Sequence, residues 1–329
     1  MNPDISVIIP AYNTGTYIKK AINSVLSQTF ENFEIIVVDD ASTDDTVQVI
    51  KTIKDNRLKL ICQKYNQGAG ASRNRALKEA VGDWIAVLDS DDWYAPERLE
   101  KLLEFAQKHQ ADIVADDFYI IEDGEAVPRT TMLEYHNSSI KDVLRITPTF
   151  FVLSDIDGRK GLELGFSKPL FRRSFLIENN IFYKPEITVS QDFWLDLDCL
   201  VRDAKFFLLP EPYYYYLSRE GALTTSTNTI KRLDEECAAV HKFCRDEANY
   251  LRENVKLAKA LNLKLRETQK LRDYHKVVDC LKQRKLLKAG LESLQSPLFY
   301  QKVLSEIPKV ISRYFKAIFL KTKIYKKFS

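Results

Sequence analysis

Residues 85–93 read Ile-Ala-Val-Leu-Asp-Ser-Asp-Asp-Trp, an apolar run that stops in three carboxylates. A short apolar run of this kind indicates a buried strand, and a strand that delivers so much negative charge at its end needs a cation there. Side chains alternate along a strand, so Asp89 and Asp91 are predicted to project the same way. Hard oxygen ligands at that spacing suit Mg2+ or Mn2+ carrying a phosphorylated substrate. The alternative is a solvated acidic turn that only closes the strand.

The chain around this run alternates apolar strands with amphipathic helices. Strands are predicted at 5–9, 35–38, 58–63, 84–88 and 112–121. Helices are predicted between them at 16–28, 47–53 and 71–80. Strands that are apolar throughout are covered on both faces. This order predicts an α/β fold with a doubly wound, mostly parallel, Rossmann-like sheet, whose ligand crevice lies at the carboxyl ends of the strands.

Polar and glycine-rich segments follow three of these strands. Asp39 and Asp40 come after the second strand, the loop at 66–70 after the third, and the acidic run after the fourth. Because parallel strands end at the same edge of a sheet, we expect these segments to form one pocket. The polar stretch at 122–160 contains several turn residues and is predicted to be an irregular, mobile section over the crevice.

Charge divides the chain into parts. Residues 1–120 hold 13 Lys and Arg against 19 Asp and Glu, and residues 121–229 hold 12 against 16. Residues 230–329 hold 24 against 11, which indicates an anionic surface or polyanion as the partner of that segment. Glycine is rare there, and apolar residues from 251 to 265 follow helical spacing. We therefore predict a nucleotide-sugar-binding half at 1–120, an acceptor-binding half at 121–229 and a helical, basic C-terminal region at 230–329.

Cysteine and histidine give no sign of a disulfide framework or a zinc site. The five cysteines are scattered without a Cys-x-x-Cys pair, and the four histidines are not clustered. No stretch approaches the ~18 to 20 apolar residues that span a bilayer, and no signal sequence precedes the first strand. These features predict a cytoplasmic protein.

Four motifs in sequence order resemble family 2 glycosyltransferases. They are Ser-Val-Ile-Ile-Pro-Ala-Tyr-Asn at 6–13, Ile-Val-Val-Asp-Asp-Ala-Ser-Thr-Asp at 36–44, Asn-Gln-Gly through Ser-Arg-Asn at 66–74, and Asp-Ser-Asp-Asp at 89–92. The resemblance is dense over residues 5–117. A second set, at 168–182, 191–192 and 210–216, is similar to the acceptor half of bacterial members. The resemblance implies the A-type glycosyltransferase fold and a nucleotide-sugar donor, with a UDP-sugar favoured.

The resemblance also implies roles for residues on the donor side. Asp39 is expected at the uracil edge, Tyr12 against the base and Arg73 at the diphosphate. Asp91, supported by Asp89 directly or through water, is expected to hold the Mg2+ or Mn2+ ion that meets the charge of the leaving diphosphate. The remaining predicted donor contacts are Pro10, Gly68 and Ser90.

Asp192 is the predicted catalytic residue. An inverting enzyme needs a carboxylate base opposite the leaving group to take the proton of the acceptor hydroxyl. Family members usually have Glu-Asp at this point, whereas this chain has Gln191 and Asp192. The alternative for Asp192 is a helix N-cap, because it precedes the apolar helical run at 193–201.

Acceptor contacts are predicted at Asp92, Trp93, Trp194 and Arg219. Aromatic walls suit the C-H faces of sugars, but core packing is an equal alternative for both tryptophans. Relatives often carry arginine soon after the tyrosines at 213–216, where this chain has Leu217; Arg219 can compensate.

Residues 301–329 contain eight Lys and Arg and one acid among apolar residues at helical spacing. Such a basic amphipathic helix can lie in the headgroup region of an anionic membrane. The alternative is a solvated helix packed on the catalytic domain. The first reading predicts a peripheral protein on the inner face of the cytoplasmic membrane.

The sequence therefore predicts an inverting glycosyltransferase that extends a bacterial surface polysaccharide on a glycan or lipid-linked acceptor. Nucleotidyl transfer and dinucleotide-dependent oxidoreduction are disfavoured, because residues 10–13 read Pro-Ala-Tyr-Asn where a glycine-rich loop would stand. A non-catalytic nucleotide-sugar-binding or membrane-associated scaffold is the alternative, favoured by Gln191 and the basic tail. No nucleic-acid partner is expected, because the tail is more typical of an interfacial helix.

Overall fold

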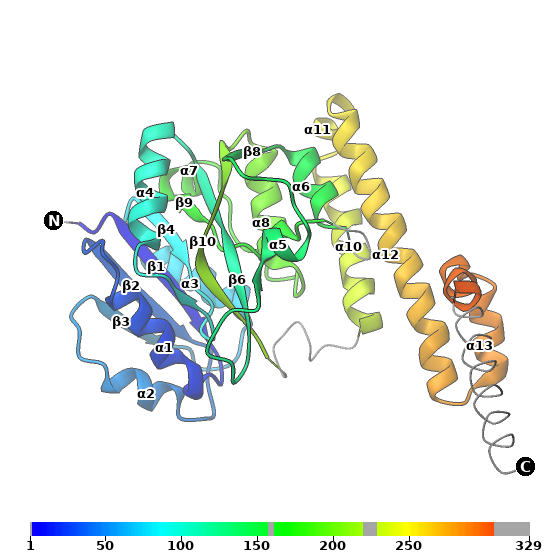
Figure 1. Cartoon of the computed structure of the whole chain (residues 1–329), viewed down its shortest axis with the longest axis horizontal. Coiled ribbons are helices and arrows are strands. Elements are labelled where there is room, and N and C mark those ends of the chain that lie inside the picture. Colours follow the sequence, from blue (N-terminus) through cyan, green and yellow to red (C-terminus); the bar gives the residue numbers. More distant parts are fainter. Residues whose placement is uncertain (1, 157–160, 220–228, 306–329) are drawn as a thin grey trace, which may run out of the picture.

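The computed structural model of the chain describes residues 2–156, 161–219 and 229–305 (Figure 1). Its strands are β1 (Ile5–Ala11), β2 (Phe33–Asp39), β3 (Leu58–Cys62), β4 (Trp84–Val87), β5 (Trp93–Tyr94), β6 (Ile113–Glu122), β7 (Thr130–Thr131), β8 (Leu144–Ile146), β9 (Leu170–Arg172) and β10 (Phe206–Ser218). Its helices are α1 (Gly15–Leu26), α2 (Thr46–Thr52), α3 (Ala69–Glu79), α4 (Arg98–His109), α5 (Met132–Tyr135), α6 (Pro148–Ser154), α7 (Arg173–Glu178), α8 (Gln191–Leu200), α10 (Thr229–Asp246), α11 (Ala248–Glu253), α12 (Val255–Lys282) and α13 (Leu286–Ser293).

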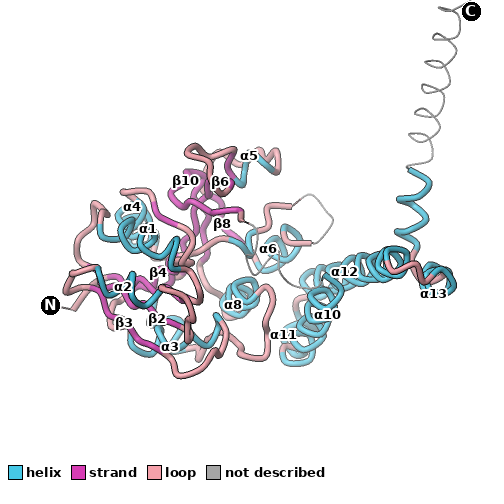
Figure 2. Tube along the Cα trace, turned by 90° about the horizontal axis from the view of Figure 1, so that it is seen from below, coloured by secondary structure: helices cyan, strands magenta, loops and turns pink. Residues whose placement is uncertain are grey.

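The described strands form one mixed sheet in the order β3-β2-β1-β4-β9-β6-β10-β5, with β7 and β8 paired to β6 and β10. β1 to β4 pair in parallel, as do β6 and β10. The short strands β5, β7, β8 and β9 pair antiparallel with their neighbours. Helices α1 and α4 lie over one face and α3 over the other (Figure 2). The predicted α/β fold with a doubly wound sheet and a helical C-terminal region is confirmed.

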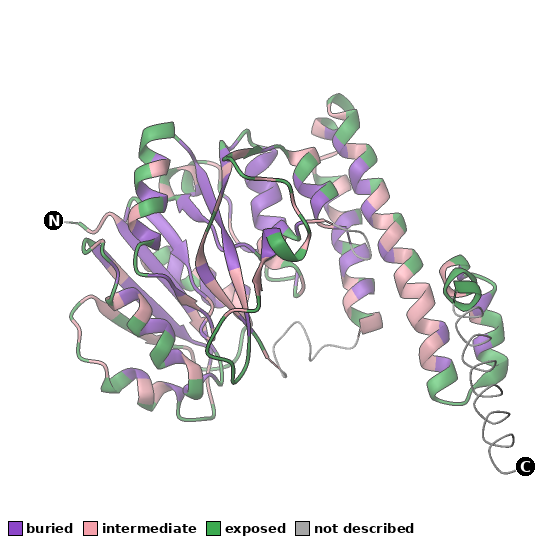
Figure 3. Cartoon of the chain, viewed as in Figure 1, coloured by how far each residue is buried: buried purple, intermediate pink, exposed green. Residues whose placement is uncertain are grey.

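The apolar runs form the core because helices cover both faces of the sheet. Val7, Ile8 and Ile36 have no exposed surface, and the central strands are buried along most of their length (Figure 3). Each of the five strands and three helices predicted within residues 1–121 overlaps an observed element. The strand register places the ends of β1 and β2 side by side, which creates the edge where the site lies.

The prediction of an irregular section at 122–160 was wrong where short helices and strands form. The described part, 122–156, contains β7, α5, β8 and α6. Thr131 caps α5 with a capping box, and Thr147 caps α6 with Pro148 in its first turn. These start signals satisfy free backbone N-H groups and therefore nucleate short helices.

The C-terminal region is helical, but its elements begin elsewhere than predicted. The helix expected from 251 to 265 is split, because Leu251 belongs to α11 and α12 runs from Val255 to Lys282. None of the described helices is long and apolar enough to cross a membrane. Most of the basic stretch predicted at 301–329 lies outside the described residues, which end at 305.

A buried lysine joins this region to the sheet domain. Lys264 of α12 donates a hydrogen bond to the carbonyl oxygen of Asp155 (2.7 Å) and pairs with Glu236 of α10 at 3.1 Å. Its side chain is 3% exposed, and its ammonium lies 4.3 Å from the centre of the Phe193 ring of α8. Because a buried charge needs its partners, this contact fixes α10 and α12 against the domain that carries the site.

Candidate active site

The carboxyl ends of β1, β2 and β4 meet at one edge of the sheet and carry most of the predicted donor residues. Asp39 ends β2 beside the end of β1. Pro10 lies within β1, and Tyr12 follows that strand with 47% of its surface exposed. Asp89 and Ser90 follow β4. Residues that were predicted from separate motifs therefore lie along one edge.

One carboxylate oxygen of Asp39 is buried but has no hydrogen-bond partner among the described residues. Its Oδ2 accepts a hydrogen bond from the backbone N-H of Ser42 at 3.2 Å. Its Oδ1 has no hydrogen-bond partner in the part of the chain that the structure describes. Leaving a buried carboxylate oxygen without a donor is costly, so this atom is suited to a donor group of a bound molecule.

Asp40 organises the loop before α3. Its carboxylate accepts the backbone N-H groups of Gln67 (2.8 Å) and Gly68 (2.7 Å) and the side-chain amide of Gln63 (2.8 Å). Gly68 has φ of +87°, a left-handed conformation that glycine adopts without steric cost. These bonds set the start of α3 and so the position of Arg73 one turn later.

Four side chains from distant parts of the chain form a charge cluster, which comprises Arg73, Asp89, Lys168 and Asp192. Arg73 Nη2 donates to Asp89 Oδ1 at 2.6 Å, and Arg73 Nη1 lies 3.7 Å from Asp192 Oδ1. Lys168 Nζ lies 3.0 Å from Asp192 Oδ2 and 3.4 Å from Asp89 Oδ2. Arg73 and Lys168 thus each bridge Asp192, the predicted base, and Asp89, a predicted donor residue.

Both cations of the charge cluster are buried and stay charged. The side chains of Arg73 and Lys168 are 7% and 5% exposed. Burial disfavours the ammonium, but Asp192 and Asp89 raise the pKa of Lys168 above its usual value. Burial also opposes the charge of Asp89, yet Lys168 and Arg73 lower the pKa of this carboxyl to about 2. The cluster therefore holds its positive charges close to a strand end.

Asp192 is held by donors and does not cap its helix. Ser190 is the N-cap residue of α8, and Asp192 lies in the first turn. The Tyr183 hydroxyl donates to Asp192 Oδ1 at 3.1 Å, and Lys168 donates to Oδ2. The N-cap alternative was wrong, because the carboxylate faces these side chains and not the free N-H groups of α8. Its neighbour Gln191 accepts a weak hydrogen bond from Arg73 at 3.4 Å.

Asp91 is paired with Arg219 rather than with the charge cluster. Arg219 Nε donates to Asp91 Oδ2 at 2.8 Å, and the Asp91 side chain is 20% exposed. The guanidinium also lies 4.9 Å from the centre of the Tyr17 ring. Burial and the neighbouring charge of Asp89 raise the pKa of Asp91. Within the described residues, no group of three or more His, Cys, Asp or Glu is arranged to hold a metal ion unaided.

Asp92 and Trp93 link the acidic loop to β10. The Tyr214 hydroxyl (2.6 Å) and the backbone N-H of Leu217 (2.8 Å) donate to the Asp92 carboxylate. Asp92 is only 2% exposed and both of its oxygens accept hydrogen bonds from the protein, so its prediction as an acceptor contact was wrong. Trp93 stacks on Tyr215 with ring centres 5.2 Å apart and is partly exposed, and its role as an acceptor contact stays a prediction.

The sequence that forms this site matches a known protein family over much of its length. The model of the family described as "Glycosyl transferase family 2" matches residues 6–176, more than half of the chain. The chain is a family 2 glycosyltransferase. The match includes three members of the charge cluster, Arg73, Asp89 and Lys168, and ends before Asp192.

Relatives of this glycosyltransferase come from several bacteria. It is 29% identical over 296 residues to the succinoglycan biosynthesis protein ExoO of Rhizobium meliloti, covering 90% of this chain and 82% of the relative. It is 42% identical over 119 residues to the "UDP-Glc:alpha-D-GlcNAc-diphosphoundecaprenol beta-1,3-glucosyltransferase WfaP" of Escherichia coli, covering 36% of this chain and 47% of the relative. The crystal structure of S. aureus TarS 1–349 in complex with UDP matches with a TM-score of 0.58 at 25% identity, over 80% of this chain and 71% of that one.

Trp194 of the glycosyltransferase belongs to the core. It is 2% exposed and lies 5.0 Å from the Phe193 ring and 5.6 Å from the Phe243 ring of α10, centre to centre. The prediction of Trp194 as an acceptor contact was wrong, because its side chain points from α8 toward α10. The packing alternative accounts for Trp194.

Asp196 is a buried carboxyl one helical turn after Asp192. It has no exposed surface, and neither oxygen has a hydrogen-bond partner within the described residues. Burial, with the nearby charge of Asp192, raises its pKa well above the usual value, and Lys168 only partly opposes this. The folded protein therefore holds a proton on Asp196 up to a higher pH than the unfolded chain does.

Asp196→Asn is expected to stabilise the protein at pH 7 and to have little effect near pH 4. Because the pKa of Asp196 is higher in the folded state than in the unfolded chain, the aspartate lowers the free energy of unfolding as pH rises above the unfolded-state pKa. The loss is about 1.4 kcal/mol per pH unit while only the unfolded state is ionised. Urea unfolding from pH 4 to pH 7 measures the difference, with the exposed Asp246→Asn as control. A difference that does not depend on pH would contradict the assignment.

Lys168 and Tyr183 were not predicted as site residues. Lys168 lay in a segment that resembles the family, but no spacing links it to Asp89 or Asp192, which are distant in sequence. A lysine next to an apolar strand was the available signal, since lysine is almost never fully buried unless it is paired.

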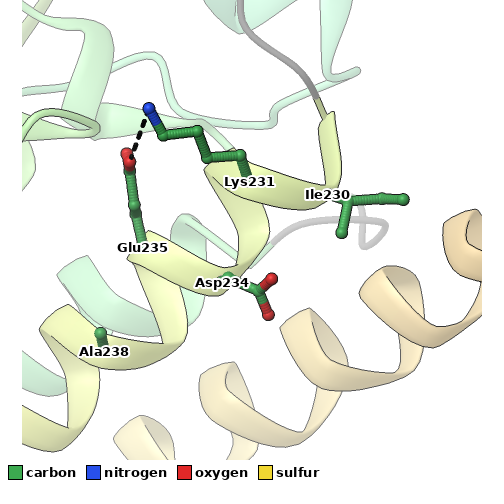
Figure 4. Close-up of a pocket in the computed structure, with 5 residues that line it drawn as sticks. All are labelled: Ile230, Lys231, Asp234, Glu235 and Ala238. Carbon is green, nitrogen blue, oxygen red and sulfur yellow. Dashed lines mark ion pairs between the residues drawn. The ribbon is translucent and has the colours of Figure 1, made fainter.

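A hollow on α10 contains none of the predicted site residues (Figure 4). It is lined by Ile230, Lys231, Asp234, Glu235 and Ala238, and Lys231 and Glu235 are paired at 3.7 Å.

Proposed function

We propose that the protein is an inverting, metal-dependent hexosyltransferase that moves a sugar from a UDP-sugar to a glycan or lipid-linked acceptor in bacterial surface polysaccharide synthesis. The charge cluster carries this proposal, because it puts a carboxylate, Asp192, beside two buried cations at the edge where Asp39 keeps an open oxygen. The UDP complex of TarS and the donor and lipid diphosphate in the name of WfaP support the substrate class.

Donor recognition begins at Asp39. Its open Oδ1 can accept the imide N-H of uracil, and the exposed ring of Tyr12 can stack on the base. Cytosine has an acceptor at the same ring position, so a carboxylate there favours uracil over cytosine. The site therefore selects a uridine nucleotide by one buried charged acceptor.

Asp39→Asn is expected to lower the affinity for UDP about 10- to 100-fold and to reduce the preference for UDP over CDP. A hydrogen bond to a charged group contributes about 1.5–3 kcal/mol, which is this range in affinity. Calorimetric titration with UDP and with CDP measures both effects, and Glu34→Gln near the other end of β2 serves as control. Equal affinity of the unaltered protein for UDP and CDP would refute the proposal.

The leaving diphosphate needs positive charge as the bond to the sugar breaks. Arg73 and Lys168 are fixed before any ligand binds, because Asp89 and Asp192 already orient them. Charged donors that do not reorganise during the reaction stabilise developing negative charge best. We assign Arg73 and the backbone around Gly68 to the diphosphate, and Lys168 to the space between the leaving group and Asp192.

Asp192 acts as the base in this proposal. Lys168 and Tyr183 donate to its two oxygens and so hold the ionised form in one orientation. The acceptor hydroxyl transfers its proton to this carboxylate as it attacks the sugar carbon from the face opposite the diphosphate. Gln191 supplies a neutral amide beside it, so the base stands without an adjacent acid.

A divalent ion fits at Asp91 and Asp89. The negative charges of Asp89 and Asp91 repel each other, so binding of a cation between them is favourable. Arg219 neutralises part of this negative charge. Mg2+ and Mn2+ are often bound by one or two carboxylates, with substrate phosphates and water as further ligands. When bound, such an ion supplies Lewis-acid stabilisation of diphosphate oxygens. Asp91 would be the direct ligand, and Asp89 would support it while it orients Arg73.

We further propose that the protein works at the inner face of the cytoplasmic membrane. The excess of Lys and Arg after residue 230 supports attraction to anionic lipids. A lipid-linked acceptor would be presented at the same surface.

A further inference from the structure

Helix α13 packs with its small residues inward and its leucines outward. Its buried residues are Ala289 and Ser293, and the element it packs against is α12. Leu287, Leu291 and Leu294 are 90%, 68% and 76% exposed. Their spacing of four and three residues puts them on one side of the helix. An ordinary surface helix has the reverse arrangement, so this face is suited to an apolar partner.

The next helical segment, within 297–305, repeats the pattern. Tyr300, Val303 and Leu304 are 46%, 43% and 64% exposed and share one side at helical spacing. On the other side, the ammonium of Lys302 lies 4.1 Å from the centre of the Tyr274 ring of α12. In this segment Leu298 and Phe299 are partly buried. Both consecutive segments thus leave large apolar side chains outside.

The charge around these leucines selects the partner. Residues 282–305 contain five Lys and Arg (Lys282, Arg284, Lys285, Lys288 and Lys302) and one acid, Glu292. The sequence from 306 to 329 adds seven more Lys and Arg and one more acid. A second copy of the chain would bring the same positive charge against this face. An anionic bilayer offers both the opposite charge and an apolar interior.

We propose that α13 lies in the plane of an anionic membrane, with Leu287, Leu291 and Leu294 at the headgroup–acyl boundary and the flanking cations among the lipid phosphates. This inference deepens the membrane part of the proposed function and rests on it. It differs from attraction by the basic tail alone, because the apolar contact persists at high salt whereas the electrostatic contact is screened. Figure 1 places α13 at the end of α12 away from the sheet, where a flat surface can reach it.

The test uses the full chain and the triple variant Leu287→Ser, Leu291→Ser, Leu294→Ser. Flotation with phosphatidylglycerol–phosphatidylethanolamine vesicles at 0.5 M salt is expected to show at least about 100-fold weaker binding of the variant, because each leucine withdrawn from an apolar phase changes partitioning on the order of tenfold. Val81→Ser, Val127→Ser, Ile177→Ser is the matched control, since these residues are 48%, 74% and 50% exposed elsewhere. The control should bind as the unaltered chain does.

Equal binding of the triple variant and the control at high salt would overturn the proposal. Binding of the unaltered chain to phosphatidylcholine vesicles as strong as to the anionic vesicles would also overturn it. So would a dimer of the unaltered chain that dissociates in the triple variant, because the leucines would then belong to an interface with a second copy. Thermal stabilisation by UDP, measured on the same samples, reports on the donor site. If UDP stabilises every variant equally while flotation fails, the membrane inference fails and the proposed transfer chemistry stands.

Discussion

Asp192→Asn is expected to lower sugar transfer about 100- to 10,000-fold while UDP still binds. Asparagine keeps the shape of the side chain but cannot take the proton of the acceptor hydroxyl, and a positioned base contributes about 100- to 10,000-fold. Lys168 and Arg73 lose part of their pairing with this residue, but both retain Asp89. The measurement is the rate of release of UDP from a UDP-sugar with an acceptor present, together with calorimetric affinity for UDP.

Asp198→Asn is the matched control for this change. Asp198 lies on the same helix, α8, and pairs with Lys184 at 2.6 Å outside the charge cluster. It should keep nearly normal transfer. An Asp192→Asn protein that transfers sugar at a near-normal rate would remove the base from the proposal. Loss of UDP affinity together with transfer would instead assign Asp192 to donor binding, and a chain that binds UDP-sugars but never turns them over would favour the scaffold function.

Asp91→Asn is expected to abolish metal-dependent transfer and the stabilisation by UDP that depends on Mn2+. A neutral amide is a much poorer ligand than a carboxylate for a hard divalent ion. We expect transfer to fall at least about 100-fold and the additional thermal stabilisation given by Mn2+ with UDP to disappear. Thermal unfolding with UDP alone, with Mn2+ alone and with both separates the two ligands.

Asp83→Asn is the control for Asp91→Asn, because Asp83 is exposed and precedes β4 whereas Asp91 follows it. The control should respond to Mn2+ and UDP as the unaltered protein does. A full Mn2+ response in the Asp91 variant would show that Asp91 is not the ligand, and transfer that persists in a chelator would exclude a role for the ion.

The sequence predicted the first half of the sheet and the edge that carries the donor residues. Runs such as 5–9 and 35–38 are almost entirely apolar, which is typical of strands in a parallel sheet that is covered on both faces. Asp39 and Asp89 follow such runs directly, so their place at the strand ends needed no tertiary information. What periodicity could not predict is the antiparallel β9, whose three residues depend on two neighbours that are distant in sequence.

Tertiary packing decided the residues for which the prediction was wrong. Trp194 and Asp192 are two positions apart on α8, and the rotation of that helix sends one toward α10 and the other toward Lys168. Asp92 is adjacent to Asp91, but Tyr214 draws it into the interior. Lys168 could not be placed at all, because its role depends on charges contributed by two other segments. Side-chain direction, rather than residue type, separated the site from its surroundings.

The length of α12 has a consequence for the acceptor. This helix of 28 residues is joined to the sheet domain through Lys264 and carries α13 beyond its C-terminal end. At 1.5 Å per residue, the part from Lys264 to Lys282 can act as a rigid spacer of about 27 Å between the sheet domain and α13. Unlike a flexible linker, such a spacer sets a fixed stand-off height, so the enzyme would act as a ruler that matches only acceptors whose sugars extend that far above the lipid.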